Sequence, residues 1–161
     1  MSQAIPHLSV RVFKSGGRLL VSAQEGRRSG DEGAITPFES VEVDWDEVEE
    51  LSQEVARLLT AQQQARGLLA RLERAGQLLF ELVLGPRSKE TLRGSRAQSL
   101  SLSLHGDLLD LPWELFHDGT NFLSLRYAMG RLVQAADDPP AAPAPPPPGP
   151  PRPLLLAPPR P

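Results

Sequence analysis

The chain of 161 residues contains no cysteine. Disulfide scaffolds, thiolate metal sites and cysteine nucleophiles are therefore excluded within these residues. Excess positive charge is also missing, since 17 basic residues stand against 20 acidic ones and no segment concentrates the basic ones. Binding to a phosphate backbone requires such a concentration, so we expect no nucleic-acid partner.

Long apolar runs are absent as well. No uninterrupted run approaches the roughly 18 to 20 residues that span a bilayer, and the first residues lack a basic region followed by an apolar core. We expect a soluble, cytoplasmic protein with no membrane partner. The lack of disulfides agrees with a reducing compartment.

Proline is scarce in most of the chain and abundant at its end. Thirteen of the seventeen prolines lie in the last 23 residues. This composition predicts one domain over 1–138 and a proline-rich linker or tail over 139–161, which we expect to be disordered. The tail suits either a polyproline ligand for SH3-like grooves or a semi-rigid spacer, and we favour the spacer because short proline runs are common in linkers.

Alternating apolar and polar residues open the chain. Residues 7–14 place Leu8, Val10 and Val12 on one face, and 18–23 form a second apolar run after a glycine-containing turn. Glycine can supply the positive φ that a tight reversal needs, so we predict a β-hairpin over 7–23. A short third strand is predicted at 37–43.

A long amphipathic helical region is predicted from Asp44 to about residue 84, as one helix or two. Asp44 is the expected N-cap and Glu47 occupies the third helical position, so the acidic cluster here is interpreted as a helix start that the dipole stabilises, not as a metal site. The apolar positions with helical spacing are Val48, Leu51, Val55, Leu58, Ala65, Leu69, Leu72, Leu79 and Val83, with interruptions at Gln62 and Gly76. We expect this face to pack in the domain core rather than in a coiled coil.

The second half of the domain returns to strands. Gly85-Pro86 ends the helical region, 87–93 predicts a short helix, and the serine–leucine alternation over 98–104 predicts a strand. After a helical turn at 113–115 we predict a hairpin-like pair of strands running to residue 133. The predicted fold class is α/β.

Motifs that carry chemistry are missing. There is no dinucleotide or nucleotide phosphate loop, no His-Glu-x-x-His and no Gly-x-Ser-x-Gly, so we expect no metal and no cofactor. An acid–base site is conceivable where Asp107, Asp110, Glu114 and Asp118 lie near His105 and His117. Turn and capping roles account for Asp107 and Asp118 without catalysis, and we prefer them.

One stretch carries a family likeness. The run LSLSLHGDLLDLPWELFHDGTNFLSLRYAMGRLV, residues 100–133, resembles a segment of the CHAT domain, in which a strand, a Pro-Trp-Glu-Leu turn and an Asp-Gly-x-x-Phe-Leu motif follow in this order. CHAT domains are caspase-like, clan CD cysteine peptidase domains, mostly bacterial and often joined to TPR arrays. The residues that match the motif are Pro112, Trp113, Glu114, Asp118, Gly119, Phe122 and Arg126.

The resemblance implies a caspase-like three-layer fold that is incomplete here. In that family a His-Gly pair ends a later strand and a cysteine follows the next one, and neither position exists in this chain. His105-Gly106 precedes the Pro-Trp-Glu motif, where the family places no catalytic histidine, so we assign His105 to a turn. We therefore expect no catalytic residues and no activity from this chain alone, although the parent family is a peptidase family.

Two explanations of the missing half stay open. The chain is either a fragment or a short protein that retains only the scaffold. RPLLLA, residues 152–157, resembles the start of the next core strand of the family. We favour a fragment, because removing half a sheet would leave an edge strand and apolar faces uncovered.

The expected roles follow from this choice. Pro112, Trp113 and Glu114 are interpreted as structural, with support of a substrate groove as the alternative. The expected partners are proteins: the peptide substrate of a complete domain, or a TPR-type or other regulatory module. The alternative function is a small scaffold that binds a partner through the helical region 44–84 or through the proline-rich tail.

Overall fold

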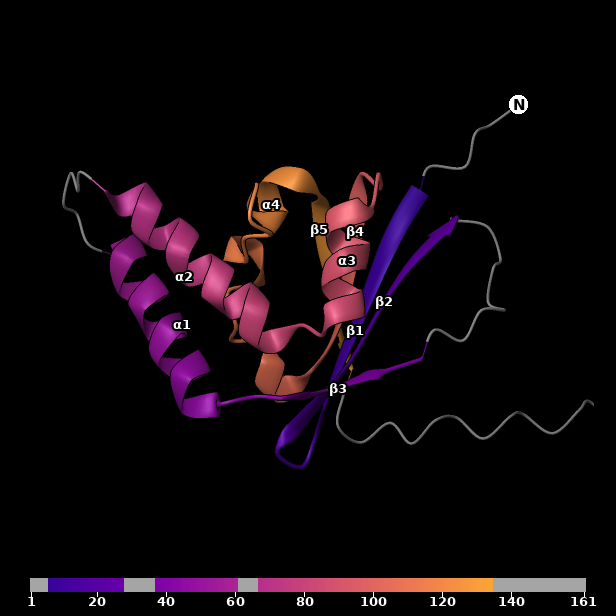
Figure 1. Cartoon of the computed structure of the whole chain (residues 1–161), viewed down its shortest axis with the longest axis horizontal. Coiled ribbons are helices and arrows are strands. Elements are labelled where there is room, and N and C mark those ends of the chain that lie inside the picture. Colours follow the sequence, from indigo (N-terminus) through magenta and orange to yellow (C-terminus); the bar gives the residue numbers. More distant parts are fainter. Residues whose placement is uncertain (1–5, 28–36, 61–66, 135–161) are drawn as a thin grey trace, which may run out of the picture.

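A computed structural model describes residues 6–27, 37–60 and 67–134 of the chain, which form a mixed α/β fold (Figure 1). Ala65, Gln62 and the predicted tail 139–161 lie outside these residues. The elements in chain order are β1 (Pro6–Ser15), β2 (Arg18–Arg27), β3 (Glu39–Glu42), α1 (Trp45–Thr60), α2 (Leu68–Val83), α3 (Pro86–Gly94), β4 (Ser99–His105), the 3₁₀ turns η1 (Gly106–Leu108) and η2 (Trp113–Leu115), α4 (Leu123–Arg126) and β5 (Ala128–Gln134).

Within the described ranges, the strands form one five-stranded mixed sheet in the order β3-β2-β1-β4-β5. The predicted hairpin is confirmed: β1 and β2 pair antiparallel from Ser15 opposite Arg18 outward, and Gly16 in the turn has a φ of 63°. β3 continues this antiparallel part, whereas β4 lies parallel to β1 and β5 lies parallel to β4.

The two faces of the sheet differ in composition. One, here called the core face, carries side chains at most 1% exposed: Leu8, Val10, Val12, Leu19, Val21, Leu100, Leu102 and Leu104. The other, here called the serine face, carries His7, Ser9, Arg11, Phe13, Leu20, Ser22, Gln24, Ser99, Ser101, Ser103 and Leu132. None of the serine-face residues belongs to the hydrophobic core cluster. The strand period of two therefore separates a buried surface from a mostly polar one.

Two antiparallel helices, α1 and α2, occupy the predicted helical region and pack side by side (Figure 1). Asp44 caps α1 as predicted, since its Oδ1 accepts hydrogen bonds from the backbone N–H groups of Asp46 and Glu47 at 3.2 and 3.3 Å. Val48, Val55, Leu58, Leu79 and Val83 are buried, as their spacing predicts, and Leu51 and Leu72 are partly buried.

Two details of that prediction are wrong. Leu69 is 61% exposed, because it begins the first turn of α2 on the side away from the core. Gly76 does not interrupt a helix but lies in the middle of α2, where it is buried. Its lack of a side chain lets α2 approach another segment, as described below.

The predicted short helix over 87–93 is confirmed as α3, with Pro86 at its first turn. Glu39 of β3 caps this helix: its carboxylate accepts hydrogen bonds from the backbone N–H groups of Arg87 and Ser88 at 2.7 and 2.8 Å. The Ser88 hydroxyl donates a third at 2.6 Å. An acidic residue is favourable at this end of a helix, so this contact joins the sheet edge to α3.

The predicted pair of strands running to residue 133 is wrong. Only a single antiparallel bridge joins His117 to Phe122, after which α4 forms and β5 pairs with β4 in parallel. The alternation of Leu123-Ser-Leu-Arg imitates a strand, but the N–H of Tyr127 bonds to the carbonyl of Leu123 at 2.9 Å and closes a helical turn. The chain therefore enters β5 as a parallel crossover strand, not as a hairpin arm.

Candidate functional site

All seven residues that match the family motif lie in the connection from β4 to β5, here called the motif segment, residues 106–127. Side chains of this segment enter the same core cluster as the helices and the core face. In the view of Figure 1, α4 of this segment lies between α2 and α3.

Trp113 anchors the segment. It is 1% exposed, its ring stacks on Phe116 with centroids 4.7 Å apart, and its indole N–H donates to the carbonyl of Leu108 at 2.8 Å. Pro112 precedes it and caps η2, and the carbonyl of Pro112 accepts from the N–H of Leu115 at 2.9 Å. A buried tryptophan with its N–H satisfied is a packing anchor, which agrees with the structural interpretation of both residues.

Asp118 and Arg126 form an ion pair within the motif segment. Asp118 is 4% exposed; its Oδ1 accepts from the backbone N–H groups of Thr120 and Asn121, both at 2.8 Å, and its Oδ2 accepts from Arg126 at 2.5 Å. Arg126 also donates to the carbonyls of Arg93 and Ser95 at 2.7 and 3.0 Å. One ion pair thus joins the turn, α4 and the end of α3.

Opposing effects act on the carboxyl pKa of Asp118. Burial raises this pKa, but the N–H groups of Asn121 and Thr120 and the guanidinium of Arg126 together outweigh burial, so the net pKa lies below its usual value. Asp118 is therefore held as a carboxylate. A carboxylate that already accepts three hydrogen bonds is poorly suited to accept a proton from a substrate.

Glu114 has a separate partner. It forms an ion pair with Arg131 of β5, whose Nε donates to Glu114 Oε1 at 2.9 Å. Arg131 also donates to the carbonyl of Leu109 at 2.6 Å. Burial raises the pKa of the Glu114 carboxyl, but Arg131 and the backbone N–H of Glu114 itself together outweigh burial, so the net pKa lies below its usual value. The pair ties η2 to the last strand.

Gly119 and Phe122 complete the turn. Gly119 has a φ of 99°, a conformation that favours glycine, and its N–H donates to His117 Nδ1 at 3.1 Å. Phe122 is 8% exposed and its ring meets the His117 ring edge-on, with centroids 5.0 Å apart. His117 therefore carries its proton on Nε2 when neutral and serves the turn.

Helix α2 docks directly on the motif segment. The carbonyl of Gly76 accepts from the N–H of His117 at 3.1 Å. A Cβ at Gly76 would lie 2.0 Å from the carbonyl oxygen of Leu115, far inside van der Waals contact. Only glycine permits this approach.

The imagined acid–base cluster is not assembled as one site. Asp107 pairs with Lys14 at 3.5 Å, Glu114 with Arg131, and Asp118 with Arg126, each on a different element. His105 ends β4 on the serine face. Each of these three carboxylates thus has its own cationic partner within the described part of the chain.

Sequence reasoning missed the partners of the motif residues. Arg131, Arg93 and Gly76 hold the segment from β5, α3 and α2, and Arg93 donates to the carbonyl of Asp118 at 2.9 Å. Tyr127 is a further anchor, because its hydroxyl donates to the carbonyl of Leu92 at 2.6 Å. Gly76 is the one sequence signal of this packing, but in the sequence it predicts an interruption of the helix and not a contact with the motif segment.

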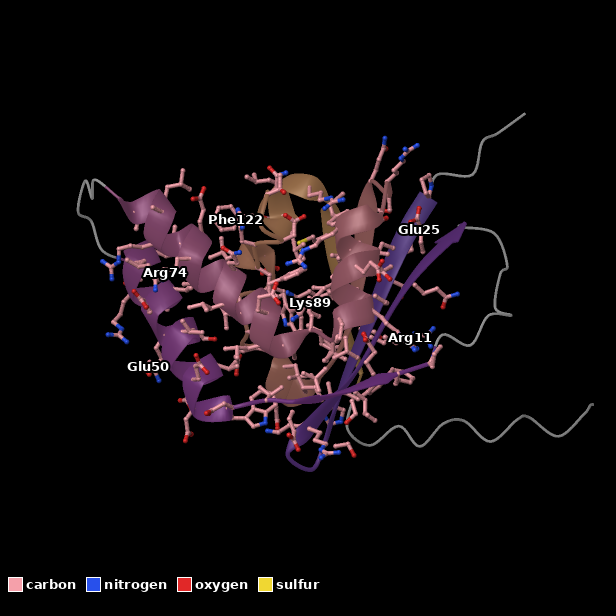
Figure 2. The ribbon with its side chains drawn as sticks, in the orientation of Figure 1. Arg11, Glu25, Glu50, Arg74, Lys89 and Phe122 are labelled. Carbon is pink, nitrogen blue, oxygen red and sulfur yellow. The ribbon has the colours of Figure 1, made fainter. Side chains whose placement is uncertain are left out.

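A surface cavity of about 580 Å³ lies between α2 and α3 and is lined in part by Glu81, Lys89 and Arg93. Figure 2 shows Lys89 on the side of α3 toward α2. Glu81 accepts hydrogen bonds from both cations at 2.6 Å, and Glu90 also lines the cavity, so two carboxylates balance the two cations.

His7 and two serines form a second polar arrangement, on the serine face. His7 Nδ1 lies 2.8 Å from Ser99 Oγ, and Nε2 lies 2.9 Å from Ser101 Oγ. A neutral imidazole has one donor and one acceptor nitrogen, so one hydroxyl donates to the ring and the other accepts from it. The distances suit a serine nucleophile and its base, but β1 and β4 are paired on both sides, so their own backbone N–H groups are used in the sheet ladders and are not free to act as oxyanion donors.

No group of three or more histidine, aspartate and glutamate residues could hold a metal ion within 6–27, 37–60 and 67–134. Across the same ranges, no helix has the length and apolar character needed to cross a bilayer.

Comparisons with known proteins leave the family open. No protein-family model matches the chain, and no curated protein or solved structure is significantly similar to it.

Proposed function

We propose that residues 1–138 act as a non-catalytic scaffold, the N-terminal part of a caspase-like domain of the CHAT type. The observation that carries this proposal is the engagement of the motif residues in internal contacts. Trp113 is buried, Asp118 is saturated by Thr120, Asn121 and Arg126, and Glu114 is paired with Arg131. Residues used in this way hold elements together and are not available to a substrate.

The chemistry of the chain supports the same proposal. A cysteine peptidase needs a thiolate, and the chain contains no cysteine. The resemblance places the catalytic His-Gly and cysteine on later strands. The scaffold would hold those strands in position, and its protein partners would be the peptide substrate of the complete domain or a regulatory module such as a TPR array.

The test has two parts. The intact mass of the native product in its source cells is compared with 17.5 kDa, and the coding DNA is read past codon 161. We expect a larger product whose downstream sequence contains a strand ending in His-Gly and a later cysteine. A native mass of 17.5 kDa would contradict the CHAT part of the proposal and leave an isolated scaffold.

The second part tests the absence of catalysis directly. The full chain is incubated with a fluorescent casein and with a serine-reactive fluorophosphonate, alongside the His7→Ala variant. We expect no cleavage and equal background labelling of both proteins. Labelling of Ser99 or Ser101 that disappears in His7→Ala would overturn the non-catalytic role, because it would show that His7 activates a serine.

A second candidate function, an interaction module, rests on the α1–α2 pair. Leu59 near the end of α1 and Leu69 near the start of α2 are 60% and 61% exposed, and Figure 1 shows both helices extending away from the strands. Exposed leucines at adjoining helix ends suit a protein partner. A Leu59→Glu/Leu69→Glu double variant expressed in the source cells should lose any larger native complex; an unchanged complex size would exclude this surface.

A further inference from the structure

The two edges of the sheet are built differently. β3 has only four residues and carries Glu39 and Glu42. Glu39 caps α3 and Glu42 pairs with Arg18 at 2.7 Å. Short, charged edge strands resist pairing with another chain. β5 has seven residues, AMGRLVQ, with no proline and no lysine, and so lacks most of these protective features.

The backbone of β5 offers hydrogen-bonding groups on its outer side. The N–H of Ala128 donates to the carbonyl of Gln98 at 2.8 Å, on the β4 side. Backbone groups alternate along a parallel strand, so the N–H and C=O groups of Met129, Arg131 and Val133 point away from β4. In the described ranges no strand lies beyond β5. Three donors and three acceptors therefore line this edge.

The side chains of β5 favour an apolar contact. Leu132 and Val133 are 60% and 61% exposed. The only charged side chain, Arg131, is held by Glu114 and by the carbonyl of Leu109 in the same molecule. Arg131 thus does not protect the edge in the way that a free charge would.

The sequence of β5 suits antiparallel pairing with the β5 strand of a second copy. Arg131 is the middle residue of the strand, so an antiparallel pairing of two copies about a two-fold axis at Arg131 uses all seven residues. Met129 then lies opposite Val133 of the second copy, and Gly130 lies opposite Leu132 of the second copy. Among the described residues, nothing lies within 4 Å of the position that a Cβ would occupy at Gly130, so the exposed leucine has room to pack there.

Charge and hydrogen bonds agree with this register. Met129, Arg131 and Val133 of each copy form hydrogen-bonded pairs, so six backbone bonds join the strands. The two Arg131 side chains meet at the axis, but Glu114 accompanies each of them. The like charges are therefore compensated within each copy.

We propose that β5 is a dimerisation edge, at which a second copy of this chain adds its own β5 antiparallel and extends the sheet across the two-fold axis. This interface is isologous, the same edge serving both copies. The proposal concerns the chain of 161 residues itself. In a longer product of the kind that the scaffold proposal expects, later strands would compete with the second copy for the same edge.

Analytical ultracentrifugation of the full chain over a range of concentrations tests the proposal. We expect a concentration-dependent species of twice 17.5 kDa. Val133→Pro removes an outward N–H that β4 does not use, and should weaken dimerisation about tenfold or more. Leu132→Lys places a charge opposite Gly130 of the second copy and should weaken it similarly.

Ser40→Lys is the matched control, because Ser40 is an exposed serine-face residue on the opposite edge, β3. It should leave the dimer unchanged, and circular dichroism checks that all three variants fold. A chain that stays monomeric at every concentration overturns the proposal, as does a dimer that survives both β5 variants. A monomer whose β5 amides resist hydrogen exchange would also overturn it and would assign the edge to a segment of the same chain.

Discussion

The core face and the serine face belong to the same strands, yet they differ in burial, since only Ser22 and Ser103 are buried among the residues named for the serine face. Leu8 and Leu104 on the core face are fully buried, whereas His7 and Ser101, one residue or three away along the same strands, are only half-buried. The difference lies in the connections. The helices between β3 and β4 and the motif segment between β4 and β5 both add residues to the core cluster. The described connections therefore stabilise one face and leave the other to polar side chains.

This comparison indicates which surfaces of the chain can form further contacts. Two carboxylates of the motif segment are paired within the molecule, Asp118 with Arg126 and Glu114 with Arg131. Parallel strands usually have both faces covered, and β1, β4 and β5 are parallel to one another. New contacts are therefore expected at the serine face and at β5. Four predictions test this difference, from the largest effect to the smallest.

Trp113→Ala should have the largest effect. It removes a buried ring that packs on Phe116 and leaves the carbonyl of Leu108 without its donor. We expect a loss of about 3 to 5 kcal/mol in the free energy of unfolding, measured by urea denaturation. Phe38→Ala is the control, since Phe38 is 43% exposed, and it should cost less than about 1 kcal/mol. Equal losses in the two variants would contradict the assigned role of Trp113.

Gly76→Ala should follow. The added methyl group would lie 2.0 Å from the Leu115 carbonyl oxygen, so α2 must move away from the motif segment. We expect a loss of about 2 to 3 kcal/mol by thermal or urea denaturation. Gly94→Ala at the exposed end of α3 has open space for the same methyl group and should lower stability by less than about 0.5 kcal/mol. A neutral Gly76→Ala would show that the close approach is not needed.

The pH dependence of stability should distinguish the ion pair of Asp118. Its pKa is lower in the folded state than in the unfolded state, so its stabilising contribution is complete above the unfolded pKa of about 4 and is lost as the pH falls through the folded pKa. Asp118→Asn should therefore lower stability by about 1 to 3 kcal/mol at pH 7 and reduce the slope of stability against pH in acid.

The exposed Asp110 supplies the control for this measurement. Asp110→Asn should keep both the stability at pH 7 and the slope in acid. If Asp118→Asn retained the full wild-type slope, the acid dependence would have to come from the other carboxyls with lowered pKa values, Glu39, Glu81 and Glu114.

His7→Ala should have the smallest effect. Its two hydrogen bonds join hydroxyls on a half-buried face, where water can replace the ring as a partner. We expect a loss of less than about 1 kcal/mol by urea denaturation. A loss as large as that of Trp113→Ala would mean that the serine face is a second core, and the comparison of the two faces would fail.

Local patterns predicted most of the elements. Alternation predicts β1 and β4, an apolar run after a glycine turn predicts β2, Asp44 is predicted as a cap, and Gly85-Pro86 marks the end of the long helical region before α3. The pairing of β4 with β1 was out of reach, since nothing in either strand encodes a neighbour about 90 residues away. The same limit explains the error at β5, where the residues 123–126 alternate like a strand but are closed into a turn by bonds from Arg126 and Tyr127 to Phe122 and Leu123.

The candidate site, like the fold, is predictable from the sequence only in part. Pro112, Trp113 and Asp118 were identified from a contiguous motif, and their structural interpretation agrees with their contacts. Their partners Arg93 and Arg131 lie outside the motif on other elements, so no spacing rule pointed to them. Ordinary surface arginines look the same in a sequence.

The parallel pairing of β1 with β4 also determines when the sheet can form. His7 and Ser99 touch although they are 92 residues apart in the chain. Closing so long a loop costs entropy before any ladder bond is gained, and a hairpin alone is marginally stable in water. During synthesis, β1 and β2 therefore leave the ribosome long before β4, the parallel neighbour of β1, has been made. The exposed hairpin is then open to chaperones, and completion of the five-stranded sheet waits for the synthesis of β4 and β5.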